Sequence, residues 1–221
     1  MAGARDPRNG PMVDLEHQHS LVAGLVLKPE VPEKVRVAFD TARNLYLYAW
    51  HVYRFYPVAE LQALTALEAG LRAALPERLP ADYQHPRQEK PMLHGLLQYA
   101  INHAHVRNEG FSRWHAVARD RARQRAEMAN LERMEREGLD SIEIDEDTPL
   151  EILPEDQDWD LVSVLKVTMH RRRNSHAHGD GGLTGQVRGT LELVAEILNQ
   201  VFPIRGATDG GAISDNSNHS A

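Results

Sequence analysis

Nine consecutive residues, His170–His178, bring together side chains that could act on a phosphate or a metal. They include three arginines, one asparagine and three histidines, and Gly179 follows them. Histidine titrates close to neutral pH, so it can accept or donate a proton. Arginine keeps its charge and offers a planar fork of donors that fits a phosphate. The pattern is compatible with a basic helix end, with a metal site or with a site for phosphate chemistry.

The first interpretation is structural. Basic residues gather at helix C-termini because they oppose the negative end of the helix dipole, and glycine is a common stop signal. This accounts for Arg171, Arg172 and Gly179. It does not require Asn174, which is a poor helix former, or two histidines on either side of Ala177.

The second interpretation is a metal site. His176-Ala-His178-Gly-Asp180 resembles the His-x-His-x-Asp-His signature of metallo-β-lactamase-type hydrolases, but Gly181 stands where the last histidine belongs. The preceding residues are charged and helix-like, whereas that signature follows an apolar strand. We therefore expect neither a metal nor a cofactor.

The third interpretation is phosphate chemistry. Arg173-Asn174-Ser-His176-Ala-His178 followed by glycine resembles the Arg-Asn-x-x-x-His motif of HEPN domains (higher eukaryotes and prokaryotes nucleotide-binding). These are all-helical modules, and many are metal-independent ribonucleases of toxin, antiviral-defence and RNA-processing systems. Their motif lies near the end of a late helix, and a final amphipathic helix follows it, as residues 183–203 do here.

The resemblance implies roles for the motif residues in RNA cleavage by 2′-OH attack. Arg173 would stabilise the phosphate and His178 would transfer a proton. Asn174 lies four residues before His178 and would share its helix face, where the amide can orient the imidazole. His176 and Arg172 are possible accessory residues.

Arg173 and His178 lie five residues apart, about 140° around an ideal helix, so one helix holds them poorly as a pair. The resemblance suggests a homodimer, because HEPN domains commonly place motifs from two subunits in a shared cleft. It also suggests RNA as substrate and an antitoxin or nucleotidyltransferase as partner. The alternative function is a non-catalytic helical module that binds nucleotide, RNA or a partner protein.

Apolar residues at three- and four-residue spacing predict the helices that position this motif. The fifth is expected to begin near Asp158, which could cap it, and to run into the arginines. The sequence therefore predicts an all-α, HEPN-like bundle of five or six helices with disordered termini. The expected helices cover about 34–49, 58–75, 92–108, 114–137, 158–178 and 183–203.

One folded domain is predicted over residues 31–203. Residues 1–30 are expected to form a flexible arm and residues 204–221, rich in Gly, Ser, Asn and Asp, a disordered tail. Within the domain, residues 113–157 combine a long charged helix with an acidic connector, and they could be an insertion in the HEPN core. A short strand at Ile142–Ile144 is the alternative for part of the connector.

Composition narrows the class of protein. The chain has 221 residues, no cysteine and a net charge of −7. The charge argues against a general nucleic-acid coating protein, since neutralising phosphates requires a positive surface. No secretory signal and no stretch of about eighteen apolar residues is present, so we expect a cytoplasmic protein that does not enter membranes.

Two other groups of residues could suggest sites. One group is His94, His103 and His105, but Asn102-His103-Ala104-His105 at a helix end is expected to be solvated or to cap the helix. The aromatic residues near position 50, Tyr46, Trp50, Tyr53, Phe55 and Tyr56, are expected to belong to the core.

Overall fold

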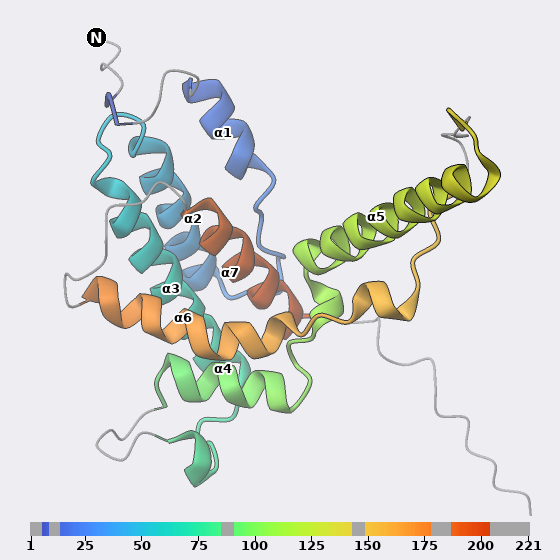
Figure 1. The fold of residues 1–221 in the computed structure, drawn as a ribbon. Helices are drawn as coiled ribbons and strands as arrows, with labels where there is room; N and C mark the ends of the chain where they lie inside the picture. The colour runs from blue at the N-terminus through green and yellow to red at the C-terminus, as the bar shows by residue number, and fades with distance from the viewer. Residues whose placement is uncertain (1–5, 9–13, 85–90, 143–148, 178–186, 204–221) are drawn as a thin grey trace, which may run out of the picture. The chain divides into compact units, whose positions relative to one another are not determined.

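The protein is described by a computed structural model (Figure 1), which covers residues 6–8, 14–84, 91–142, 149–177 and 187–203, without the side chains of residues 175–177. Within these residues the chain forms helices and no strand, which confirms the predicted all-α class. The predicted tail and residues 143–148 of the connector lie outside this description. The α-helices are α1 (Leu15–Ala23), α2 (Glu33–Tyr48), α3 (Phe55–Ala74), α4 (Leu93–Asn102), α5 (Ser112–Glu137), α6 (Leu161–Ala177) and α7 (Arg188–Val201).

The contacts within the chain divide it into two compact units. The first unit comprises residues 1–74 and 184–221, and the second comprises residues 75–183. The first therefore contains α1, α2, α3 and α7, and the second contains α4, α5 and α6. None of the described helices is both long enough and apolar enough to cross a membrane.

Helices α2, α3 and α7 form the core of the first unit and lie side by side in Figure 1. α2 buries Val35, Phe39, Ala42 and Tyr46, which are spaced by four, three and four residues and so share one helix face. α3 and α7 approach closely at Gly70, where a Cβ atom would lie 2.2 Å from Cδ2 of Leu198. A side chain at this position would require the Leu198 side chain to move.

Helix α1 lies within the segment predicted to be a flexible arm. The Asp14 carboxylate caps it by accepting a hydrogen bond of 2.6 Å from the backbone N–H of His17. Its Gln18 side chain is buried, donates to the Tyr46 carbonyl at 2.6 Å and accepts from the Tyr56 hydroxyl at 3.1 Å. Burial, with Tyr56 nearby, raises the pKa of Tyr46 to about 12. These bonds hold α1 on the core, in which Tyr46 and Tyr56 are buried.

Helices α4 and α6 pack against each other in the second unit. Both helices bury apolar side chains, and the backbone of the short 3₁₀ turn η1 (Ala81–Tyr83) lies against Gly95 of α4. A Cβ atom at Gly95 would meet the Tyr83 carbonyl oxygen at 1.9 Å. The buried residues of the two helices include Leu93, Leu96, Leu97 and Ala100 from α4, and Leu161, Leu165 and Met169 from α6.

The long helix α5 is packed near its start and exposed further along. Trp114, Ala118 and Ala122 are buried at four-residue spacing, whereas Met128 and Leu131 are largely exposed. The 3₁₀ turn η3 (Pro154–Gln157) is held to α5 by Arg125, which donates to Asp156 at 2.8 Å. This ion pair, with the Leu153 N–H as a second donor, lowers the pKa of Asp156. Part of the acidic connector is therefore fixed in place by an arginine.

Candidate functional site

Helix α6, which carries the predicted motif, begins at Leu161 and is capped by Asp160. The Asp160 carboxylate accepts from the Ser163 N–H at 3.2 Å and also from the Ser163 hydroxyl. The predicted cap, Asp158, lies before the helix, and its carbonyl accepts from Arg121 at 3.0 Å. The helix thus starts later along the chain than the sequence suggested.

The motif lies in the last turns of α6, and its first two residues face different surroundings. Leu161, Leu165 and Met169 are buried at four-residue spacing. Arg173 is the next residue in this row and is half-buried, whereas Asn174 is exposed. We call residues Arg171–Asn174 the α6 basic end. In it Arg173 is on the packed side of the helix, while Arg171, Arg172 and Asn174 face solvent.

The histidines of the motif lie beyond the side chains that the structure describes. His178 lies outside the described residues, and His176 is within α6 but its side chain is not described. The proposed pairing of Arg173 with His178 therefore stays a prediction. The same holds for the metal interpretation, because its residues are His176, His178 and Asp180.

A histidine from another helix lies beside α6, one turn before the motif. The rings of His94 on α4 and His170 on α6 have centroids 4.4 Å apart and planes inclined by 55°. His94 is exposed and His170 is half-buried. We call these two residues the α4–α6 histidine pair. The sequence did not predict it, because the two positions lie far apart along the chain and meet only through helix packing.

The surroundings of His170 favour the neutral form of its imidazole. Its Nδ1 lies 3.1 Å from the carbonyl oxygen of Lys166, one turn earlier in α6. Burial lowers the pKa of His170, and the nearby His94 and Arg171 lower it further, against the opposing effect of the Lys166 carbonyl. A neutral imidazole can accept a proton at neutral pH.

Polar contacts also connect α6 with the end of α4, on the side of α6 that carries His170. Lys166 Nζ donates to the Asn102 side-chain oxygen at 2.8 Å, and Asn102 Nδ2 is 3.1 Å from the Tyr83 hydroxyl oxygen. Lys166, His170 and Asn174 are spaced by four residues and so form one row on α6. His103, expected to be solvated or capping, is exposed at the C-cap of α4 and stacks on Tyr99 with centroids 3.9 Å apart.

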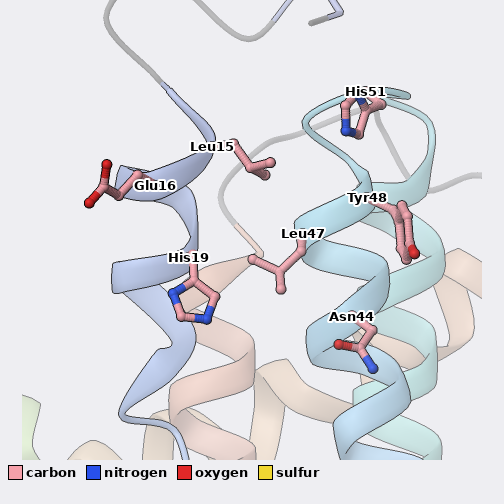
Figure 2. A pocket seen from close by; sticks show the side chains of 7 residues that line it. All are labelled: Leu15, Glu16, His19, Asn44, Leu47, Tyr48 and His51. Carbon is pink, nitrogen blue, oxygen red and sulfur yellow. The ribbon is translucent and has the colours of Figure 1, made fainter. Parts of the chain in front are cut away.

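The first unit contains a pocket of about 520 Å³ between α1 and the C-terminal part of α2. Figure 2 shows Leu15 and His19 of α1 directed toward Leu47 of α2. Leu15 and Tyr48 leave 41% and 59% of their surfaces exposed. No sequence pattern indicated this pocket, because α1 was not predicted. Its lining residues are Leu15, Glu16, His19, Asn44, Leu47, Tyr48 and His51.

Comparison with protein families, curated proteins and solved structures found no match to this chain. Function is therefore inferred from the side chains and their arrangement.

Proposed function

We propose that this protein is a HEPN-like, metal-independent endoribonuclease whose phosphodiester site is the α6 basic end. The observation that carries the proposal is the position of Arg173-Asn174 in the last turns of a packed helix, with an imidazole pair one turn before. The amphipathic helix α7 follows in the chain, in the order that the HEPN resemblance implies.

The chemistry requires few groups. Without a metal, the ribose 2′-OH attacks the adjacent phosphorus, a base takes the hydroxyl proton, an acid protonates the leaving oxygen and a cation offsets the developing charge. Arg173 would supply the cation and His178 a proton-transferring imidazole oriented by Asn174. Arg172 and His176 would assist in holding the phosphate.

The proposed assembly follows from the same resemblance. Two chains would form a homodimer that presents both motifs to one RNA. An antitoxin or a nucleotidyltransferase would restrain the enzyme in the cytoplasm, where it would act as a toxin or an antiviral-defence effector.

The test is cleavage of a folded RNA by purified protein in EDTA. We expect the wild type to cleave, and the Arg173→Ala/His178→Ala double variant to lose activity by about 1,000-fold or more, because it removes both charge stabilisation and proton transfer. A matched control is Arg136→Ala/His105→Ala, since Arg136 is 72% exposed and His105 is exposed outside the site. An inactive wild type, or a double variant as active as the wild type, contradicts the proposal.

The pocket between α1 and α2 supports a second candidate function, non-catalytic binding of a nucleotide, an RNA or a partner protein. Its aromatic ring, imidazoles and amide could stack on and hydrogen-bond a base. We would measure binding of labelled nucleotide and RNA to Tyr48→Ser and to Val37→Ser, because both side chains are 59% exposed on α2 and only Tyr48 lines the pocket. Weaker binding by Tyr48→Ser alone supports this function, and equal binding by both variants contradicts it.

A further inference from the structure

We infer that the α4–α6 histidine pair serves the proposed cleavage site from within a single chain, with His170 as the base that takes the 2′-OH proton and His94 as the relay that passes it to water. This inference rests on the proposed function and adds a base that the motif does not contain.

The position of His170 on α6 is the first support. His170 precedes Arg173 by three residues and Asn174 by four, and residues at these spacings are neighbours on a helix surface. Arg173 and His178 are less well placed, since they are five residues apart on the sequence. A phosphate held at the α6 basic end would therefore have the ring of His170 within one helical turn.

The hydrogen bond of His170 is the second support. A backbone carbonyl can only accept, so the contact of 3.1 Å to the Lys166 oxygen requires the proton of the neutral ring to be on Nδ1. The Nε2 atom of this tautomer then carries a lone pair. A general base needs such an unprotonated nitrogen, and the backbone contact fixes its direction.

The charges of the two helices are the third support, and they favour an anion. Neither α4 nor α6 contains an aspartate or a glutamate. Beside the pair, α6 contributes two positive charges, Lys166 four residues before His170 and Arg171 directly after it. A metal cation would be repelled by these groups, whereas a phosphodiester would be attracted. Burial, together with His94 and Arg171, holds the pKa of His170 below its ordinary value, which favours the unprotonated ring.

Bonds and protons balance in the proposed step. The 2′-oxygen forms a bond to phosphorus while the bond from phosphorus to the 5′-oxygen breaks, and the products are a 2′,3′-cyclic phosphate and a 5′-hydroxyl end. The 2′-OH proton moves to Nε2 of His170, and the leaving oxygen takes a proton from His178, whose proton-transferring role is then that of the acid. The His170 proton then passes to the ring of His94, whose centroid lies 4.4 Å away, and on to solvent.

The experiment measures initial cleavage rates in EDTA between about pH 5 and 9 for the full chain and its variants. We expect His170→Ala to slow cleavage by about 100-fold or more, to flatten the rise of the rate with pH, and to be partly rescued by added imidazole. His170→Asn, which keeps a donor for the Lys166 carbonyl, should be equally slow. His94→Ala should slow cleavage by a smaller factor, because water can replace a relay.

His103→Ala is the matched control, since it removes an exposed histidine at the C-cap of α4, outside the pair. The inference is overturned if His170→Ala and His170→Asn both cleave RNA at rates within about threefold of the wild type. The proposed function still stands in that case, provided that the wild type cleaves and Arg173→Ala does not. A fully active His170→Asn beside an inactive His170→Ala that imidazole does not rescue shows a structural role and also overturns it. A wild type that cleaves no RNA removes both.

Discussion

The predicted motif begins in the last turns of α6, and α7 is the next helix in the chain. The two helices differ in how much of their surface is buried. α7 buries seven of its 14 residues along one broad face, including Leu191, Val194, Ile197 and Leu198. α6 is longer, with 17 residues, but among its residues with described side chains only Leu161, Leu165 and Met169 are buried apolar positions. Val164 and Val167 of α6 remain 47% and 46% exposed.

The difference separates a helix that mainly stabilises the core from one that leaves polar groups accessible. A helix with a broad buried face has few positions for exposed polar groups, because burying such groups without partners is costly. A helix that packs along one row leaves its other faces accessible. α6 uses these faces for Lys166, His170 and the α6 basic end, while α7 contributes to the core.

The largest effect on stability is expected for Leu198→Ala in α7. Leu198 is fully buried, and truncating a buried leucine costs about 2–5 kcal/mol of unfolding free energy. The matched change in α6 is Val167→Ala, which should cost less than about 1 kcal/mol because the side chain is half-exposed. Denaturant unfolding of both variants would measure the two values. Equal losses would show that α6 and α7 are packed alike.

A smaller loss of unfolding free energy is expected for Gly95→Ala, which tests the contact between η1 and α4, the helix that packs against α6. The added Cβ would collide with the backbone of Tyr83, which cannot rotate away as a side chain can, so we expect a cost of about 1–3 kcal/mol. Gly24→Ala is the control, because no heavy atom lies within 4 Å of the position that its methyl group would take. Unfolding curves of the two variants that coincide would contradict the close contact between η1 and α4.

Removing the cap of α6 should have a still smaller effect. Asp160→Ala is expected to cost about 1 kcal/mol, since it leaves N–H groups at the helix start without their acceptor. Asp158→Ala should cost less, because only the backbone of Asp158 makes a contact there with Arg121. Thermal unfolding of both variants would decide between the two caps. A larger loss of stability in Asp158→Ala would show that Asp158 caps α6, as the sequence suggested.

The smallest effect is expected from pH near neutrality, and it depends on His170 of α6. The pKa of His170 is lowered from its ordinary value of 6.5, so the unfolded chain binds a proton more readily than the folded chain. The unfolding free energy should therefore fall as pH is lowered through about 6.5, and this contribution is absent above that pH. His170→Asn should reduce the slope, whereas Leu198→Ala should leave it as in the wild type. An unchanged slope in His170→Asn would contradict the lowered pKa.

The regular helices could be predicted from the sequence because their apolar spacing is a local signal. The helix predicted from Lys34 begins at Glu33, and the one predicted over residues 114–137 is α5. Helix α1 was missed because it is short and buries a polar residue, Gln18, whose contacts with Tyr46 and Tyr56 lie far along the chain. Asp158 and Asp160 carry the same local signal, so the sequence could not choose between them as caps.

The candidate site also contains residues that the sequence predicts and contacts that it does not predict. The motif residues Arg173 and Asn174 could be found from sequence, because the pattern is contiguous. The pairing of His94 with His170 could not, since it depends on how α4 packs against α6. Likewise, Arg125 and Asp156 are separated by 31 residues and meet only because η3 lies on α5.

The central claim is that the α6 basic end cleaves RNA through the ribose 2′-OH without a metal. The most direct measurement compares one oligonucleotide, made as RNA and as its 2′-O-methyl form, incubated with the wild-type protein in EDTA. The account predicts cleavage of the RNA alone, with 2′,3′-cyclic phosphate and 5′-hydroxyl ends. Cleavage of the 2′-O-methyl form, or an RNA that stays intact until a divalent metal is added, would contradict it.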